Sequence, residues 1–481
     1  MEDFDEIYIL NLHGNSKRQE KTPEEGKDEN VFDIQQGVSI ILLIKDGSST
    51  KKINYADLWG LREGKYKFLE EKDVENTKWQ ELTPKEPQNF FVIKDFSGSD
   101  TYNVFFGLEN IFTESSSGVK THRDHFITDL SKQTLKNRIL SFISSNDEVD
   151  VIRDLYEIPN TVSFVLEKSI VYERKRGYDE KLLVPYFYKP FDFRWIYYSE
   201  KLIDRDRKSM LGSFLKDNTG LVLMRKIVGS KWEHAFVTDS LIDINFYGFQ
   251  TYVFPLYVDT DNKVEQQTLI PNEQEELDIE GAQHTLRLSS KRRVNFQQSF
   301  LDFIDNSLIF PDPAKRKISY EEILYYIYAV FYSNIYRQKY QEFLKIDFPK
   351  IPFTKNYQLF KKLAGLGEVL VNLHLLKSET LDKPIAKFQG KDINLVEKRE
   401  YKDKKVYINE SQYFEKVDES IWNYYIGGYQ VLDKWLKDRK GRILSSDDIK
   451  HYCKVSTALS ETIKIQSQID SLYPKVEKSL V

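Results

Sequence analysis

The chain has 481 residues, 40% hydrophobic and 14% aromatic, which is enough to bury the cores of two or three globular domains. Its 70 basic and 75 acidic residues give a formal net charge of −5, which excludes a general positive field, so any nucleic-acid site must be a local patch. The single cysteine, Cys453, excludes an intramolecular disulfide framework, and the longest aliphatic run, at 40–44, is too short to span a bilayer. Because no apolar leader opens the chain either, we expect a cytoplasmic protein.

The first sixty residues predict strands with no helix between them. Residues 4–12 (FDEIYILNL), 38–44 (VSIILLI) and 52–58 (KINYADL) are rich in β-branched and aliphatic side chains, whereas 13–30 is polar and turn-rich. Nearly continuous apolar strands are usually buried on both faces, which requires covering helices that this segment lacks. Two interpretations stay open: one end of a larger sheet whose remainder lies elsewhere, or a small antiparallel sheet covered by later helices of the same chain.

The middle of the chain predicts a mixed region. From residue 86 to residue 260, short strand-like and helical patterns alternate, with frequent glycine, proline, serine and asparagine between them. Residues 261–294 are polar and rich in Glu and Gln, so we expect a linker or an excursion from the fold.

Helical patterns dominate residues 295–481. Ser319 and Glu322 have the spacing of a capping box at the start of an amphipathic helix. Further helices are predicted over 356–376 and from about Ser446, where apolar residues recur at helical spacing. The predicted fold class is therefore mixed α/β (α+β).

Patterns that would indicate a catalytic centre are incomplete. No Gly-rich loop of the dinucleotide or P-loop kind is present, and none of the 14 prolines is adjacent to another. Residues 121–125 (THRDH) have the His-Arg-Asp order of a kinase catalytic loop but lack its Asn at the required spacing. Neither His122 with His125 nor His451 with Cys453 completes a tetrahedral metal set. We therefore predict no catalytic and no metal-binding residues.

Four stretches stand out from this background and carry a resemblance to a known family. They are SSGVKTHRD (116–124), YKPFDFRWIYY (188–198), VFPLY (253–257) and IGGYQVLDKWLKDRKGR (426–442). In this order they resemble the C-terminal specificity (target-recognition) region of type ISP restriction-modification enzymes and related adenine-specific DNA methyltransferases. The likeness runs from FDEIYILNLHGN (4–15) to the end of the chain.

The resemblance implies a domain organisation and partners. The opening segment would be the last part of a methyltransferase sheet, and the partners would be double-stranded DNA and an upstream methyltransferase and helicase-nuclease portion, with no membrane. The implied domains are the C-terminal part of an adenine methyltransferase domain (1–85), a mixed α/β target-recognition region (86–260), the polar linker or excursion (261–294) and the mainly helical remainder of the specificity region (295–481).

The resemblance also bears on cofactor and catalysis. Complete enzymes of this family bind S-adenosylmethionine on a Gly-containing loop and hold a flipped adenine with an Asn-Pro-Pro-aromatic motif. Neither motif is present in this sequence. What is implied is a sequence-specific DNA-recognition module that binds no cofactor and is not catalytic by itself. The alternative is part of a split adenine methyltransferase that is active only with an upstream chain.

The first candidate DNA-binding residues are Ser117, Lys120, Thr121 and Arg123, in the loop beside Gly118. A glycine lets backbone amides approach a phosphate while nearby side chains contact the phosphate or a base edge. The resemblance implies that this loop faces DNA. The local composition alone also fits an ordinary polar turn.

Two further clusters mix basic and aromatic residues. Arginine suits bidentate contact with guanine and phosphate, and aromatic rings can stack on bases or wedge between them. The alternative is a strand over 190–198 whose aromatic residues belong to the core and whose arginine pairs with Asp192. The candidates from these clusters are Arg194, Arg205, Arg207, Lys208, Arg225 and Lys231.

The last candidates, Lys437, Arg439, Lys440 and Arg442, lie near the end of a helix predicted from about Gly428. Cations in the last turn of a helix complement the helix dipole without any binding partner, so a solvent-exposed helix face explains part of this pattern. The concentration of cations beyond that predicts phosphate contact rather than base reading.

Overall fold

The chain forms two compact units, unit 1 (Met1–Ser97) and unit 2 (Gly98–Ile227 with Lys231–Val481). Its fold is mixed α/β, as predicted, with several small sheets. None of the described helices combines the length and apolarity needed to cross a bilayer. The computed structural model describes residues 3–18, 20–47, 51–84, 89–93, 96–227, 231–260, 292–311 and 318–481.

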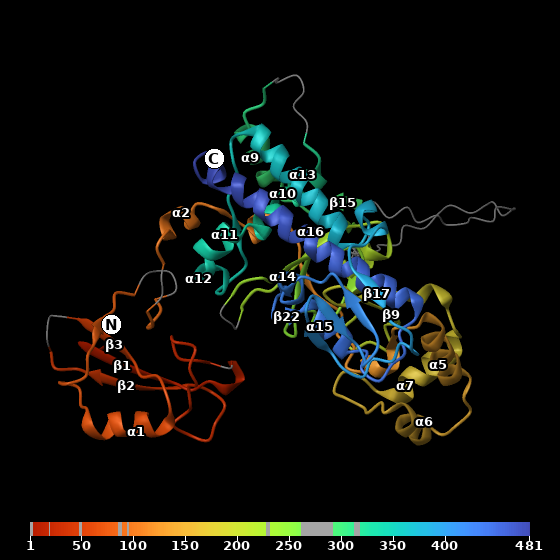
Figure 1. Ribbon diagram of the computed structural model, residues 1–481, viewed down its shortest axis with the longest axis horizontal. Coiled ribbons are helices and arrows are strands. Elements are labelled where there is room, and N and C mark those ends of the chain that lie inside the picture. The colour runs from red at the N-terminus through yellow and green to blue at the C-terminus, as the bar shows by residue number, and fades with distance from the viewer. Residues whose placement is uncertain are drawn as a thin grey trace, which may run out of the picture. The chain divides into compact units, whose positions relative to one another are not determined.

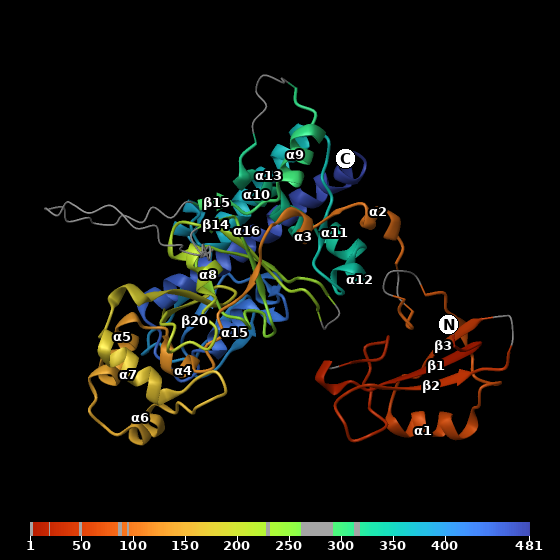
Figure 2. The same cartoon turned by 180° about the vertical axis from the view of Figure 1, so that it is seen from behind.

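Unit 1 is built on one mixed sheet in the order β2-β1-β3-β4 (Figures 1 and 2). β1 (Glu6–His13) pairs antiparallel with β2 (Val38–Ile44) and parallel with β3 (Lys52–Asp57), and β4 (Gln80–Glu81) pairs with β3. α1 (Arg62–Glu71) packs on one face. The three strands predicted from the sequence are confirmed.

β2 is an edge strand of this sheet (Figure 1), and its apolar side chains are exposed. Five consecutive residues, Ile40 to Ile44, are between 36% and 53% exposed. Successive side chains of a strand point to opposite faces, so both faces of β2 are uncovered within the described part of unit 1. A long apolar edge of this kind favours pairing with another chain.

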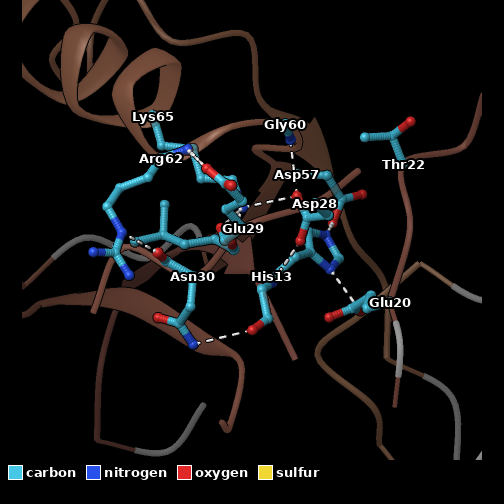
Figure 3. A network of polar contacts seen from close by, with 12 residues as sticks. His13, Glu20, Thr22, Asp28, Glu29, Asn30, Asp57, Gly60, Arg62 and Lys65 are labelled. Carbon is cyan, nitrogen blue, oxygen red and sulfur yellow. Dashed lines mark hydrogen bonds and ion pairs between the residues drawn. The ribbon is translucent and has the colours of Figure 1, made fainter. Parts of the chain in front are cut away.

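A network of buried charges holds the loop between β1 and β2 (Figure 3). Lys65 of α1 is fully buried, and its ammonium donates to Asp28 Oδ1 at 2.8 Å and to two backbone carbonyls at 2.7 and 2.6 Å. Asp28 also accepts the backbone amides of Gly14 at 2.6 Å and Gly60 at 2.8 Å. All three ammonium protons of Lys65 therefore have acceptors, which offsets the desolvation of the buried pair.

His13 ends β1 in the same network (Figure 3). Its Nε2 lies 2.7 Å from Asp57 Oδ1 and its Nδ1 lies 3.0 Å from Glu20 Oε1. The ring stacks on Trp59, with 3.2 Å between the centroids. These contacts attach the start of the loop to the end of β3.

Unit 2 has one continuous hydrophobic core that joins its N-terminal strands to its C-terminal helices. α10 (Tyr320–Tyr332), α13 (Tyr357–His374) and α16 (Ser446–Glu477) pack side by side (Figures 1 and 2). The predicted capping box of Ser319 and Glu322 is present at the start of α10. α10 and α13 approach closely at Gly367, where a Cβ would lie 1.9 Å from the carbonyl oxygen of Tyr325.

The remaining helices of unit 2 are mostly short. They are α2 (Ser99–Asn103), α3 (Leu108–Ile111), α4 (Asp124–Ile127), α5 (Lys132–Ser144), α6 (Val149–Tyr156), α7 (Leu166–Arg176), α8 (Lys208–Leu211), α9 (Gln298–Ser307), α11 (Asn334–Lys339), α12 (Gln341–Leu344), α14 (Glu419–Trp422) and α15 (Val431–Lys437). Figure 1 shows α5, α6 and α7 grouped together, apart from the packed helices α10, α13 and α16.

The strands of unit 2 are short and form several small sheets, in the orders β11-β10-β13-β6, β12-β8-β9-β7, β14-β15, β16-β5, β17-β20-β19-β18 and β21-β22. Their bounds are β5 (Phe106–Gly107), β6 (Ser116–Ser117), β7 (Thr128–Asp129), β8 (Leu183–Lys189), β9 (Asp192–Tyr197), β10 (Gly220–Leu223), β11 (Ala235–Thr238), β12 (Leu241–Ile242), β13 (Tyr252–Pro255), β14 (Tyr257–Asp259), β15 (Arg292–Val294), β16 (Lys350–Ile351), β17 (Lys387–Gln389), β18 (Glu400–Lys402), β19 (Lys405–Tyr407), β20 (Tyr413–Glu415), β21 (Tyr425–Ile426) and β22 (Tyr429–Gln430).

The predicted linker, 261–294, lies outside the described residues except at its end. Residues 292–294 form β15, which pairs antiparallel with β14, so that Asp259 is the partner of Arg292. The chain therefore leaves and re-enters the described fold at neighbouring positions. The domain boundaries predicted from the sequence stay a prediction.

Candidate nucleic-acid interface

The loop over 116–124 is fixed by backbone pairing. Ser117 belongs to β6 and pairs with β13. The amide of Gly118 donates to Thr251 O at 3.1 Å, and Lys120 exchanges two backbone hydrogen bonds of 3.0 Å with Arg205. The loop is thereby joined to residues 203–208, which the sequence analysis had treated as a separate basic cluster.

Gly118 serves close packing rather than phosphate binding. A Cβ at this position would lie 2.6 Å from the backbone carbonyl of Asp243 and 2.7 Å from the amide of Ile244. The amides of Gly118, Val119 and Lys120 all donate within the protein. The expectation that these amides approach a phosphate is therefore wrong for this loop.

Arg123 and Thr121 are buried, each about 2% exposed. Arg123 donates to the carbonyl of Leu202 at 2.7 Å, and its guanidinium lies 3.6 Å from the centroid of the Phe164 ring. Burial lowers the pKa of Arg123 to about 10. Thr121 donates to Asp124 within the loop. These side chains position the loop from inside, and their predicted contact with DNA stays a prediction.

Lys120, Arg205, Arg207 and Lys208 form the first cationic group of the surface. The two segments that carry them lie side by side through the Lys120–Arg205 bridge and through Arg207 Nε, which donates to Ser117 Oγ at 3.1 Å. Arg205 and Lys208 are exposed, and Lys120 and Arg207 are half-buried. Among the described residues, no carboxylate pairs with any of these four side chains.

Arg194 of β9 lies in a network of charged pairs. Its Nε and Nη2 donate to Asp192 Oδ2 at 3.1 and 2.9 Å, and its Nη2 lies 3.3 Å from Asp438 Oδ2. Its guanidinium stacks on Tyr188, 3.6 Å from the ring centroid. The predicted pairing of Arg194 with Asp192 is confirmed.

Arg439 lies behind this network, 4% exposed. Its Nη2 donates to Asp192 Oδ1 at 2.8 Å, and its guanidinium lies 3.5 Å from the centroid of the Trp435 ring. Burial alone would raise the pKa of Asp192, but the ion pairs with Arg439 and Arg194 hold it below its usual value. The Arg439 side chain ties the residues after α15 to β9, and its predicted contact with a phosphate stays a prediction.

The glycine pair before α15 forms the turn between β21 and β22. Gly427 has a φ of +59°, and a Cβ there would lie 2.7 Å from the ring of Tyr247. The turn and this packing require the glycine. Because Gly428 and the next two residues belong to the hairpin, α15 begins at Val431 rather than near Gly428.

Lys437, Lys440 and Arg442 form the second cationic group. All three are exposed, and within the part of the chain that the structure describes no carboxylate pairs with them. They surround Asp438 and the buried Arg439, so they lie next to the Arg194 network.

A polar cleft of about 640 Å³ lies beside the second cationic group, of which Arg442 lines it directly. His122 also lies in the cleft wall, with its Nδ1 3.3 Å from Asp204. In the sequence these two residues stand next to the first cationic group, but no member of that group lines the cleft. The full lining is His122, Asp124, His125, Thr128, Asp129, Leu130, Tyr188, Arg194, Asp438 and Arg442.

Two acidic residues of the cleft are held in unfavourable surroundings for a charge. Burial, followed by the neighbouring Asp243, raises the pKa of Asp124. Burial, followed by Asp192, raises the pKa of Asp438. The cleft therefore places hydrogen-bond acceptors beside the donors of Arg194, a combination that matches the mixed donors and acceptors of base-pair edges.

The structure does not join the other two candidates to this cleft. Arg225 is exposed and its Nε pairs with Asp347 Oδ1 at 2.8 Å. Lys231 is exposed as well. No hydrogen bond or ion pair among the described residues connects either side chain with the cleft.

Sequence reasoning missed most of the residues that line the cleft, among them Asp124, Tyr188 and Asp438. Each of these three stands inside one of the quoted stretches. Asp438 stands between the candidates Lys437 and Arg439 in the sequence. Its place between two cations was the one available signal, and its contact with Arg194, 244 positions away in the sequence, could not be read from that pattern.

Comparison with solved structures finds this fold in three DNA complexes. The ATP-dependent Type ISP restriction-modification enzyme LlaBIII bound to DNA matches with a TM-score of 0.68 and 21% identity. A nuclease-deletion mutant of the Type ISP enzyme LlaGI with a DNA substrate mimic matches at 0.65 and 18%, and a DrdV–DNA complex at 0.70 and 20%. Each match covers 97% of this chain, which spans only 31%, 37% and 48% of those chains respectively.

No curated protein matches the sequence. The model of the Type ISP C-terminal specificity domain matches residues 110–468, which is most of the chain and includes both cationic groups and the cleft. The chain belongs to the Type ISP C-terminal specificity domain family.

Proposed function

We propose that this chain is the sequence-specific DNA-recognition module of a type ISP-like restriction-modification adenine methyltransferase, and that it does not transfer methyl groups by itself. The observation that carries the proposal is the polar cleft lined by Arg194 and Arg442, together with two groups of surface cations that have no carboxylate partner among the described residues, in a chain whose formal net charge is −5. Membership of the specificity-domain family and the fold shared with DNA-bound enzymes support it.

The two kinds of residue would have different tasks. Exposed cations without carboxylate partners would bind phosphates and set the register on the duplex. The cleft, with Arg194 and its acidic neighbours, would face base edges. The proposed DNA-contacting set is Lys120, Arg194, Arg205, Arg207, Lys208, Lys437, Lys440 and Arg442.

The test is binding of duplex DNA followed by fluorescence anisotropy. If about six phosphates are contacted, affinity should fall on the order of 10³-fold between 50 and 200 mM salt. Replacing Arg205 or Lys440 with alanine should lower the salt slope by about one each. Lys464→Ala removes a lysine on α16 that pairs with Glu461, outside the cleft, and should change neither affinity nor slope. Absence of binding at low salt, or a slope near zero, would reject the proposal.

We also propose that an upstream methyltransferase portion covers β2 and supplies the site for S-adenosylmethionine. The chain spans less than half of each enzyme that shares its fold. β2 offers an unpaired edge with the exposed residues Ile40 to Ile44, a suitable place for the rest of a sheet. A cytoplasmic location belongs to the same proposal, because the enzyme must reach cellular DNA.

A further inference from the structure

We infer that Arg194 determines specificity by reading a guanine of the target duplex, and that Asp438 occupies the guanine-binding edge of Arg194 until the base displaces it. The inference rests on the proposed function and deepens it. The proposed function names DNA as the ligand and the cleft as its site, whereas this inference names guanine as the base and Arg194 as the residue that contacts it.

Arg194 is held rigidly for such a contact. One face of its guanidinium lies on Tyr188 at 3.6 Å, and its Nε and Nη2 hold Asp192 at 3.1 and 2.9 Å. Asp192 is fully buried and is fixed from the other side by Arg439 at 2.8 Å. Two layers of contacts therefore orient the plane of the guanidinium, which reduces the entropy lost when it binds a base.

The remaining edge of Arg194 is free to bind. Its Nη1 has no hydrogen-bond partner among the described residues, and 18% of the side chain is exposed in the cleft. Guanine presents O6 and N7 in the major groove as two adjacent acceptors, which match two N–H groups of one guanidinium. Nη1 together with the outer N–H of Nη2 provides that pair.

Asp438 is the group that must leave this edge. Its Oδ2 lies 3.3 Å from Arg194 Nη2, longer than the bonds to Asp192, and 31% of its side chain is exposed. The network around Arg194 therefore contains one permanent buried partner, Asp192, and one that can turn away. A guanine that offers two acceptors can replace this single long contact.

The surroundings place a duplex at this edge. The second cationic group lines the cleft at Arg442, and His122 of the cleft wall stands two residues after Lys120 of the first group in the sequence. Phosphates held by these cations would bring a groove over the cleft. Two arginines line the cleft within the described residues. Arg194 is held by Asp192 and by the ring of Tyr188, whereas the side chain of Arg442 has no partner there.

The experiment starts with the full chain and a randomised duplex library. Wild type should select sequences with at least one required guanine, where exchange of the G·C pair lowers affinity by about 5- to 150-fold. A 7-deazaguanine at that position, which lacks the N7 acceptor, should also weaken binding. Arg194→Lys keeps the positive charge but loses the two adjacent N–H donors of the guanidinium. This variant should abolish the requirement for guanine at this position and at no other. Arg399→Lys, at a half-buried arginine paired with Asp433 outside the cleft, is the matched control and should leave all requirements in place.

A second variant tests the same edge from the acidic side. Asp438→Asn should raise affinity for the selected duplex more than for the duplex without the guanine, whereas Asp433→Asn in α15, five residues earlier, should change their ratio little. If Arg194→Lys has a lower melting temperature than Arg399→Lys, the comparison of Asp438→Asn with Asp433→Asn alone tests the inference. The inference is overturned if wild type selects sequences without a required guanine, if folded Arg194→Lys keeps every requirement, or if Asp438→Asn raises both affinities equally. No DNA binding by wild type would instead reject the proposed function.

Discussion

Replacing Arg439 with methionine tests whether this arginine is part of the fold or of the DNA surface. The substitution leaves Asp192, which is wholly buried, with Arg194 as its remaining ion-pair partner. Removing one member of a buried pair costs about 3 to 5 kcal/mol of unfolding free energy when the other charge is left uncompensated. Because Arg194 still pairs with Asp192, we expect a loss at the lower end of this range, about 3 kcal/mol. Lys440→Ala, at the exposed neighbour, should stay within about 0.5 kcal/mol. Urea denaturation followed by circular dichroism measures both.

The double variant Asp192→Asn/Arg439→Met sharpens this test. When Asp192 is already replaced by asparagine, loss of Arg439 leaves no buried carboxylate without this partner. The double variant should therefore lose less unfolding free energy than the two single variants together, by about 0.5 to 3 kcal/mol. The pH dependence has a fixed sign. The pKa of Asp192 is lowered in the fold, so its ion pairs contribute fully above the usual aspartate pKa of 3.8 and are lost as the pH falls below it. Arg439→Met should weaken this acid-dependent loss. An Arg439→Met protein that is as stable as wild type but has a lower salt slope in DNA binding would refute the reasoning.

Three further outcomes are expected. Calorimetry of the chain alone with S-adenosylmethionine should show no binding, because the sequence lacks the donor loop; measurable binding would contradict this. Replacing Ile41 and Leu43 of β2 with threonine should reduce self-association in sedimentation velocity and weaken assembly with a co-expressed upstream methyltransferase segment, whereas unchanged behaviour in both would show that β2 is not the docking edge. Affinity for non-specific DNA should rise as the pH falls from 7 toward 4, because the raised pKa of Asp438 lets this carboxylate lose its negative charge at a higher pH than an ordinary aspartate. In Asp438→Asn the rise in affinity should be smaller, and a rise identical to that of wild type would contradict this role of Asp438.

Local signals predicted the elements well. The capping box at Ser319 and Glu322, the helical spacing after Ser446 and the three apolar strands of unit 1 all depend on residues close in sequence, and the structure contains each of them. The family resemblance is confirmed over residues 110–468, which the quoted motifs had indicated.

The site was predicted less completely, for a physical reason. Arg123 and Arg439 have the sequence neighbours of surface cations, but their partners Phe164 and Asp192 come from distant parts of the chain. Only the folded chain shows that these contacts bury them. The glycines of the motifs show the same limit: Gly427 is required by the ring of Tyr247, which no local pattern reveals.

The pairing of β14 with β15 makes the segment after Asp259 a convenient position for protein engineering. Asp259 and Arg292 are antiparallel partners, so their Cα atoms lie one strand spacing apart, roughly 5 Å. Ends this close can be joined by a two-residue turn or by a folded domain whose own termini are adjacent. A fluorescent reporter inserted at this point would leave the register of both strands intact, so that binding of labelled DNA could be followed by energy transfer.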